Sequence, residues 1–272
     1  MKEILVICTL FFLLHGNWAA EMRVVSLAPA LSEIVCYLGG EKTLVGRCSA
    51  CDYPESIKSL PAAGRFGMPE IERIAALRPD WVIGNDLMNK QLIKKLNRLG
   101  IETAFEQINN INDYLFWLKL IGEKLGKIEP MQAALETFTQ KKADLQRLPP
   151  LPLKVVWIVN AKPLIVAGAG SLPDGTMQLM HVENAAADVD SAYFKCSPEW
   201  LLSRRIDLII WGIPGSPAKS DRFWQKVPAV QKNQIVFHDI YDPVTRPGPR
   251  YLDAVLVMRK KIEQKAGFAH EK

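Results

Sequence analysis

The sequence predicts an α/β protein made of two similar lobes, and two features of the chain support this fold class. Short apolar strands alternate with amphipathic helices, which is typical of βαβ units around a parallel sheet. One pattern of Glu, Arg, Asp and an apolar strand also occurs twice, once in each half of the chain. A chain of 272 residues is long enough for two lobes that each bury their own core.

The first half contains four expected strands, each a short run of apolar or β-branched residues, at 23–27, 43–47, 81–84 and 102–105. Three helices are expected between them, at 30–38, 70–77 and 90–99. Glycine follows the first and the last of these helices, at Gly39-Gly40 and Gly100, and is expected to end them. The segment Cys51–Glu55 is expected to be a turn, because it contains Asp and Pro.

From Ile111 to Leu148 the apolar residues keep helical spacing, apart from Gly126 and Pro130. The segment 131–148 is predicted as one long helix, which Pro149-Pro150 ends. Strands and helices then alternate again, with strands at 154–159, 164–167, 208–211 and 235–238 and helices at 177–180, 198–203 and 251–266.

The repeated pattern begins at Glu72 and at Glu199. In each copy an Arg stands six positions after the Glu, an Asp stands eight positions after it, and an apolar strand and a Gly follow. We therefore expect 21–127 and 151–272 to be N-terminal and C-terminal α/β lobes, with 128–150 as the linking helix. Two lobes that face each other across a cleft are an architecture for holding a ligand.

The first 20 residues are expected to be a secretory signal peptide. Lys2 precedes the apolar run Ile4–Leu14, and small residues stand before Glu21. The apolar run is too short to span a bilayer, although an uncleaved anchor remains an alternative. The mature protein is therefore expected to be exported.

Composition and motifs exclude several classes of function. The net charge of +5 is spread along the chain without a basic tract, so a nucleic-acid partner is not expected. The mature histidines His181, His238 and His270 lack the spacing of metal ligands, and the G-x-S-x-G motif of a hydrolase is missing. Gly168-Ala169-Gly170 is interpreted as a tight turn, and His238 as a hydrogen-bonded residue at a strand end. The sequence thus indicates a binding protein, not an enzyme, with no cofactor and no metal site.

Four cysteines remain after the expected signal peptide: Cys36, Cys48, Cys51 and Cys196. An oxidising compartment permits disulfides, and Cys48 and Cys51 form a lone C-x-x-C. A local disulfide between these two, a long-range disulfide and free thiols all stay open.

Aromatic and polar residues follow the ends of the expected strands, where parallel α/β folds bind their ligands. The candidate ligand contacts in these positions are Tyr53, Phe66, Asn85, Trp211, Asp239, Tyr241 and Thr245.

A family resemblance extends over nearly the whole mature chain. The residues that carry it are Arg23–Pro29 with Glu33, Val45–Arg47, Cys51–Pro54, Glu72–Ile74, Pro79-Asp80, Leu99–Ile101, Glu183–Ala186, Ser197–Glu199 and Pro247–Arg250. In these motifs the sequence resembles the periplasmic substrate-binding proteins of ABC importers for cobalamin, siderophores and haem, above all the cobalamin-binding branch. The resemblance implies two Rossmann-like lobes joined by a rigid helix, a ligand cleft between them, and a monomer in the periplasm.

The resemblance also implies roles for particular residues. Tyr53 and Phe66 match aromatic contacts to a corrin ring, and Glu72 and Glu199 match paired carboxylates that dock on the permease subunits of the importer. The expected ligand is cobalamin or a related corrinoid. A ferric siderophore or haem remains an alternative, because Arg65, Arg246 and Arg250 suit an anionic ligand, and an exported thiol redox enzyme that uses Cys48 and Cys51 is a further one.

Overall fold

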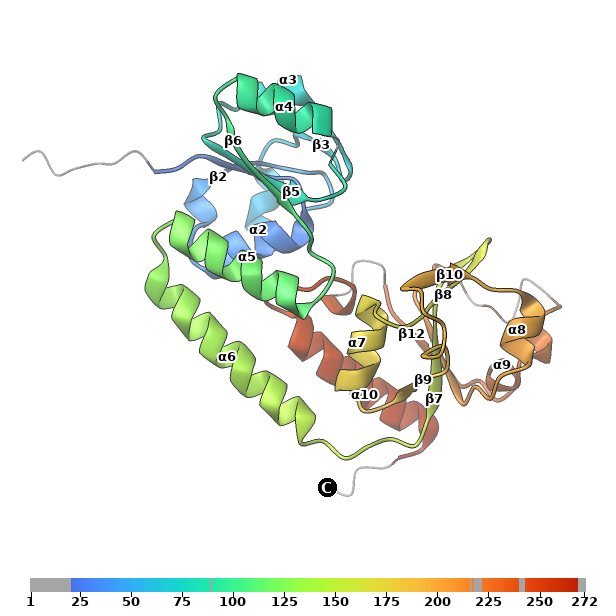
Figure 1. Ribbon diagram of the computed structural model, residues 1–272. Helices are drawn as coiled ribbons and strands as arrows, with labels where there is room; N and C mark the ends of the chain where they lie inside the picture. Colours follow the sequence, from blue (N-terminus) through green and yellow to red (C-terminus); the bar gives the residue numbers. More distant parts are fainter. Residues whose placement is uncertain (1–20, 89, 216, 218–221, 240–242, 269–272) are drawn as a thin grey trace, which may run out of the picture. The chain divides into compact units, whose positions relative to one another are not determined.

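The computed structural model describes residues 21–88, 90–215, 217, 222–239 and 243–268 (Figure 1). The expected signal peptide, 1–20, and Tyr241 lie outside these described residues. The chain divides by its internal contacts into two compact units. Unit 1 takes its described residues from Met1–Ser32 and Gly40–Phe105, and unit 2 from Glu33–Gly39 and Glu106–Lys272.

Unit 1 is built on a four-stranded sheet with the order β2-β1-β5-β6. Its strands are β1 (Val24–Ser26), β2 (Leu44–Arg47), β5 (Trp81–Asn85) and β6 (Glu102–Glu106). Strand β1 pairs in parallel with both β2 and β5, and every residue of β1 and β5 is buried. These strands confirm the expected βαβ units, because parallel strands that are covered on both faces are buried along their whole length.

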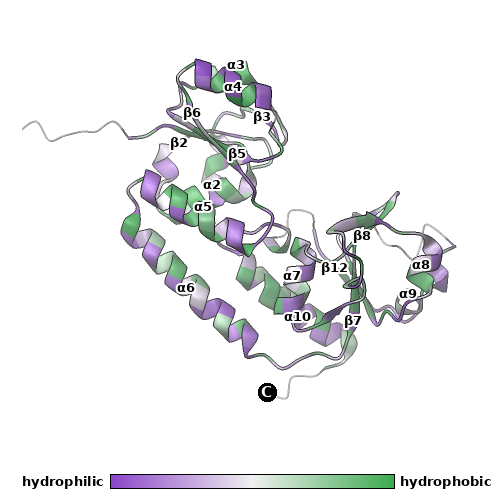
Figure 2. Cartoon of the chain, viewed as in Figure 1, coloured by the Kyte–Doolittle hydropathy of each residue, from purple (hydrophilic) through white to green (hydrophobic). Residues whose placement is uncertain are grey.

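The helices of unit 1 lie close to their expected positions. They are α2 (Pro29–Tyr37, which passes into unit 2), α3 (Ile71–Ala76) and α4 (Lys90–Arg98), with 3-10 turns at Glu41–Thr43 and Glu55–Ser59. Helices α3 and α4 contact each other (Figure 1). In α4 the two leucines are buried and the lysines are exposed, which gives the alternating hydropathy in Figure 2. This pattern is that of a helix with one face on a core.

A hairpin in unit 1 was not expected from the sequence. Strands β3 (Gly64–Arg65) and β4 (Met68–Pro69) pair in antiparallel fashion, and Phe66 and Gly67 form the turn between them. Gly67 has φ of +73°, a left-handed conformation that glycine adopts without a steric penalty.

Unit 2 contains a second sheet with the order β10-β8-β7-β11-β12, and β9 pairs with β7. Its strands are β7 (Lys154–Ala161), β8 (Leu164–Ala167), β9 (Glu183–Asn184), β10 (Tyr193–Lys195), β11 (Leu208–Trp211) and β12 (Ile235–Phe237). Strands β7, β11 and β12 are parallel, but β8 is antiparallel to β7. Strand β8 is thus an antiparallel addition to the parallel strands of this sheet. Only Lys162 and Pro163 separate β7 from β8, and a parallel connection needs a much longer crossover.

Helix α6 (Ile128–Gln146) precedes the sheet of unit 2 in the chain. Helices α7 (Leu172–Leu179), α8 (Pro198–Leu202) and α9 (Pro228–Gln231) lie between its strands, and α10 (Tyr251–Ala266) follows the last of them. Helix α5 (Ile111–Lys124) precedes them and begins with a capping box at Asn110 and Asp113. Short 3-10 turns occupy Trp224–Lys226 and Pro243–Thr245. Helix α6 packs against α5 and α10 (Figure 1).

Helices α6 and α7 begin three or more residues before their expected first residue. Helix α7 begins earlier than expected because the Ser171 side chain accepts the N–H of Asp174 and Pro173 stands in the first turn. Helix α6 likewise holds Pro130 in its first turn instead of beginning after it. The two-lobed α/β architecture is confirmed, whereas the linking role of 128–150 and the lobe boundaries stay predictions.

The internal repeat has a structural counterpart in each unit. Asp80 Oδ2 accepts the backbone N–H of Arg23 at 2.8 Å, and Asp207 Oδ2 accepts that of Lys154 at 2.9 Å. The N–H of each aspartate donates in return to the carbonyl of the same partner, at 2.8 Å in both units. Asp80 thus fixes β1 beside β5 in unit 1, and Asp207 fixes β7 beside β11 in unit 2. None of the helices in the described part of the chain has the length and apolar composition of a membrane span.

Candidate functional site

In unit 1, two aromatic side chains stand half-exposed after the carboxyl end of β2. Tyr53 lies in the loop that follows this strand, and its side chain is 45% exposed. Phe66 lies at the tip of the β3–β4 hairpin and is also 45% exposed. Large aromatic side chains are normally buried, so two that face solvent at a sheet's binding edge are candidates for stacking on a ligand.

Arg47, the last residue of β2, holds the loop that carries Tyr53. Its guanidinium donates to the carbonyls of Cys48, Ser49 and Cys51 at 3.1–3.3 Å and to the carbonyl of Lys58 at 2.7 Å. The N–H of Ser49 also donates to the carbonyl of Gly64 at 2.9 Å, which ties this loop to the start of the hairpin. Tyr53 and Phe66 are therefore presented by one hydrogen-bonded assembly of loops.

Asn85 ends β5 and is only 6% exposed. Its Oδ1 is buried and accepts no hydrogen bond from the residues that the structure describes. A buried acceptor of this kind is costly unless a partner reaches it. Asn85 is thus buried at the end of β5, unlike the half-exposed Tyr53 and Phe66, and its role as a ligand contact stays a prediction.

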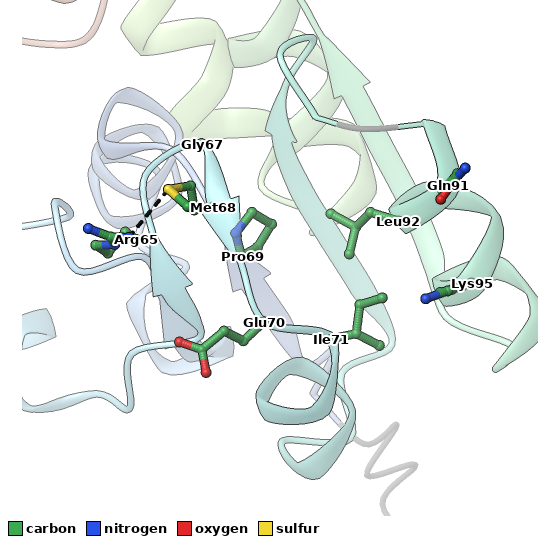
Figure 3. A pocket seen from close by; sticks show the side chains of 9 residues that line it. All are labelled: Arg65, Gly67, Met68, Pro69, Glu70, Ile71, Gln91, Leu92 and Lys95. Atoms are coloured by element: carbon green, nitrogen blue, oxygen red, sulfur yellow. Dashed lines mark hydrogen bonds between the residues drawn. The ribbon is translucent and has the colours of Figure 1, made fainter.

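A cavity of about 490 Å³ lies beside the hairpin in unit 1 (Figure 3). Its lining residues come from the hairpin, the start of α3 and helix α4: Arg65, Gly67, Met68, Pro69, Glu70, Ile71, Gln91, Leu92 and Lys95. Figure 3 shows the hairpin on one side of the cavity and α4 on the other, with Arg65 Nη2 3.4 Å from Met68 Sδ. Glu70 is paired with Arg73 at 2.7 Å, so the side chains of Arg65 and Lys95 make this rim cationic.

In unit 2, the expected contact Trp211 is 3% exposed and belongs to the core. Its ring packs edge-on against Trp224, with 5.1 Å between centroids. Its Nε1 is buried and donates to no acceptor among the described residues. Trp211 ends β11 as expected, but its side chain points into the core cluster, and a ligand-binding role for it stays a prediction.

A second cavity, of about 240 Å³, lies at the carboxyl ends of β7, β11 and β12 in unit 2. Its lining is mostly apolar and comprises Trp157, Val159, Leu172, Pro173, Tyr193, Gly212, His238 and Thr245. Among the described residues, Thr245 is the one expected contact in this lining. Asp239 is exposed and follows His238 directly.

His238 is hydrogen-bonded, as expected, and also lines this cavity. Its Nδ1 lies 2.9 Å from the carbonyl of Asp239, and its ring packs edge-on against Trp157 with centroids 5.1 Å apart. Gly212 leaves the space that the imidazole fills, because a Cβ at Gly212 would collide with the ring. Replacing Gly212 by a larger residue would therefore displace a wall of the cavity.

The sequence interpretation missed the aromatic and apolar residues of the second cavity: Trp157, Val159, Leu172, Pro173 and Tyr193. Trp157 and Val159 stand two positions apart on β7, and strand alternation places such residues on one face. Tyr193 is 49% exposed on β10, a strand of three residues that the sequence pattern does not reveal.

Two of the three arginines that suit an anionic ligand are held by a carboxylate of unit 2. Arg250 makes a bidentate pair with Glu33, at 2.9 and 2.7 Å, and Arg246 approaches the same carboxylate at 3.5 Å. Glu33 is 5% exposed. The Glu33 carboxylate pairs with both guanidinium groups and offsets one of their two positive charges.

The carboxylates Glu72 and Glu199 are both exposed, and each stands in the first turn of its helix, α3 or α8. The pKa of Glu199 is lowered by a hydrogen bond from its own backbone N–H and by the Ser197 hydroxyl. Glu199 therefore stays ionised at a helix start, where negative charge is favourable. In the described residues, His, Cys, Asp and Glu side chains form no group of three that could hold a metal ion.

Comparison with known proteins identifies the family. A curated relative, the vitamin B12-binding protein of Vibrio cholerae serotype O1, is 28% identical over 260 residues, covering 92% of this chain and 94% of the relative. The crystal structure of the vitamin B12-binding protein BtuF of Vibrio cholerae is 26% identical, with a TM-score of 0.75 over 89% of this chain and 97% of that one. The haem-binding protein HutB of Vibrio cholerae is 24% identical, with a TM-score of 0.78 over 89% and 98% of the two chains, and shares the fold. The profile of the family described as periplasmic binding protein matches residues 24–240, and the chain belongs to this family.

Proposed function

We propose that the chain captures cobalamin or a related corrinoid in the periplasm and delivers it to an ABC importer. The observation that carries this proposal is the pair of half-exposed aromatic rings, Tyr53 and Phe66, at the carboxyl edge of the unit 1 sheet. A corrin is broad and carries neutral amide side chains, so stacking and apolar contact suit it better than charge does. The curated Vibrio cholerae relative at 28% identity and the solved Vibrio cholerae structure at 26% identity are both named as vitamin B12-binding, which supports the same ligand class.

The charge distribution favours a corrinoid over an anionic ligand. Haem carries two propionates and ferric siderophores are commonly anionic, so both call for cations that are not already paired. Arg246 and Arg250 share the buried carboxylate of Glu33. The mostly apolar cavity of unit 2 adds hydroxyl and imidazole groups but no Lys or Arg.

Haem or an anionic siderophore is the second candidate ligand, because Arg65 and Lys95 line the cavity of unit 1. Arg65 lies on the hairpin and Lys95 on α4 (Figure 3), and a carboxylate of a ligand in the cavity could pair with them. The haem-binding neighbour HutB shares the fold at 24% identity.

The remaining parts of the proposal concern delivery. Residues 1–20 would direct export, residues 128–150 would link lobes 21–127 and 151–272, and the protein would act as a monomer. Glu72 and Glu199 would dock on the two permease subunits. The corrinoid is cargo in this scheme, not a cofactor, and because the family is one of binding proteins we propose no catalytic step.

The direct test of the site is Tyr53→Ala with cyanocobalamin in a calorimetric titration. Loss of one aromatic contact should weaken binding by about 1–2 kcal/mol, or about tenfold. Tyr37→Ala is the matched control, because Tyr37 is 47% exposed on α2 and lies outside both cavities. Equal affinity of Tyr53→Ala and the control would contradict the assignment of Tyr53, and binding of haem without any binding of cyanocobalamin would contradict the ligand.

A further inference from the structure

Cys48 and Cys51 bring two buried sulfurs into contact at the end of β2. The Sγ atoms lie 3.1 Å apart, and the two side chains are 0% and 1% exposed. The N–H of Cys51 donates to the carbonyl of Cys48 at 3.0 Å, which closes the intervening residues into a tight turn. A disulfide has an S–S bond of about 2.05 Å, so the sulfurs need to approach by only about 1 Å to bond.

The surroundings of the two thiols differ. The two thiols share a hydrogen bond, and this bond, together with backbone N–H groups and the Arg47 guanidinium, lowers the pKa of Cys48 against the opposing effect of burial. Burial raises the pKa of Cys51, which also lies 3.8 Å from the carbonyl of Ser26. A dithiol in which one sulfur ionises first has a defined nucleophile and a defined resolving thiol.

The same turn positions the loop of Tyr53. Arg47 binds the carbonyls of Cys48 and Cys51 with one nitrogen and the carbonyl of Lys58 with the other. Tyr53 stands two residues after Cys51, between these anchoring points. A movement of the sulfurs toward each other therefore shifts the Cys48 and Cys51 carbonyls. The hydrogen bonds of these carbonyls to Arg47 hold the loop in position.

We propose that Cys48 and Cys51 form a reversible dithiol–disulfide pair whose oxidation state alters the loop that carries Tyr53. The oxidant is a small disulfide such as glutathione disulfide. The Cys48 thiolate attacks one of its sulfurs and expels a thiolate, and Cys51 then loses its proton to solvent and attacks Sγ of Cys48, expelling the second thiolate. Two protein thiols lose two electrons and two protons, and one small disulfide gains them to become two thiols. Because both protein sulfurs are buried, the exchange requires local opening of the loop and is slow with bulky disulfides.

The chemistry is tested in the mature protein without any ligand. The protein is equilibrated in glutathione buffers from fully reduced to fully oxidised, starting from each side, then alkylated and mapped by mass spectrometry. We expect one two-electron transition that links Cys48 to Cys51 and remains in a variant with Cys36→Ser and Cys196→Ser. Cys48→Ser and Cys51→Ser should each abolish it. Two alkylated thiols at every glutathione ratio, or a disulfide to Cys36 or Cys196 instead, would overturn the proposal.

The effect on the loop has two readouts, of which only the second rests on the proposed function. Amide hydrogen exchange over residues 49–58 should differ between the oxidised and reduced protein and should not differ in Cys48→Ser. The affinity for cyanocobalamin should change about three- to tenfold between the two states, the scale of one aromatic contact. If cyanocobalamin binds neither state, the proposed function fails while the exchange result still decides the redox proposal. Unchanged hydrogen exchange in a protein that forms the disulfide would overturn the coupling to the loop.

Discussion

Tyr251 joins helix α10 to helix α7 through one buried hydrogen bond. Its Oη lies 2.6 Å from Oγ1 of Thr176, which itself donates to the carbonyl of Leu172 at 2.8 Å. Tyr251 therefore donates to Thr176, and the chain of bonds ends at a backbone carbonyl. Burial raises the pKa of Tyr251 from its ordinary value near 10 to about 12.

Tyr251→Phe should lower the free energy of unfolding by about 1 kcal/mol at neutral pH, because it removes one buried hydrogen bond and leaves the Thr176–Leu172 bond in place. The raised pKa gives the pH dependence. The unfolded chain ionises Tyr251 from pH 10 upward and the folded protein only near pH 12, so this contribution to stability is complete below pH 10 and is lost as the pH rises from 10 to 12.

Urea unfolding of both proteins at several pH values checks this prediction. The difference in unfolding free energy between wild type and Tyr251→Phe should shrink above pH 10. A difference that stays constant from pH 8 to pH 12 would show that Tyr251 is not protected from ionisation in the folded protein.

At individual residues, the sequence predicts which loops hold the candidate site better than it predicts which side chains are exposed. Tyr53 and Phe66 follow a strand end and are half-exposed. Trp211 and Asn85 also stand at strand ends, but their side chains are buried. Successive residues of a strand face opposite sides of the sheet. Whether the last side chain of a strand reaches solvent therefore depends on which side it faces. Both sides of these central strands are apolar, and the sequence pattern cannot distinguish them.

Asp80 and Asp207 connect the elements of each unit in the same way. Each carboxylate accepts a backbone N–H at the start of the first strand of its unit. The donor is Arg23, directly before β1, in unit 1 and Lys154, the first residue of β7, in unit 2. The equal spacing of the Glu, Arg and Asp residues in the two halves thus reflects a shared helix-to-strand connection, α3 to β5 and α8 to β11. The repeat was visible in the sequence, whereas its cause is visible only in the hydrogen bonds.

Asp80→Ala and Asp207→Ala should each lower the free energy of unfolding by about 1 kcal/mol, the scale of one hydrogen bond to a partly exposed group. Asp190→Ala is the matched control, because Asp190 is exposed in a loop. Since the two aspartates lie in different units, their effects should add in the double variant. Denaturant unfolding that shows no loss for either variant, or a loss equal to that of Asp190→Ala, would contradict the anchoring role.

Among the elements, those with long and regular patterns were predictable and the shortest were not. Helix α10 has its expected bounds and α6 keeps most of its expected length, because a helical repeat of apolar residues over many turns is a strong signal. Strands β3, β4, β9 and β10 have two or three residues each, too few for an alternating pattern. The antiparallel course of β8 could have been predicted from the two-residue connection to β7.

For the whole molecule, the repeat places one exposed carboxylate on the equivalent helix of each unit, Glu72 on α3 and Glu199 on α8. An importer with two related membrane subunits could bind one carboxylate with each subunit, and two attachments reinforce each other through effective concentration. Charge reversal adds repulsion to the loss of an ion pair. The double variant Glu72→Arg and Glu199→Arg should therefore reduce uptake far more than the double variant Glu72→Ala and Glu199→Ala.

Uptake of labelled cobalamin by cells that contain the native importer measures this effect, and ligand affinity is measured in parallel. Glu136→Arg is the control, because Glu136 is exposed on α6 and lies outside both equivalent helices. The double Arg variant should bind cobalamin as wild type does. Normal uptake by this variant, or a loss of ligand affinity in its place, would show that these carboxylates are not the docking contacts.

The central claim is that the ligand is a corrinoid, and calorimetric titration of the mature protein against cyanocobalamin, cobinamide, haemin and a ferric siderophore tests it most directly. Two half-exposed aromatic rings, an apolar cavity and two arginines held by Glu33 all favour a broad neutral ligand. We predict saturable one-to-one binding of cyanocobalamin, and of cobinamide if the corrin ring alone is recognised, with haemin and the siderophore weaker by at least about a hundredfold, or about 2.7 kcal/mol. Binding of haemin or the siderophore more tightly than either corrinoid would contradict the account.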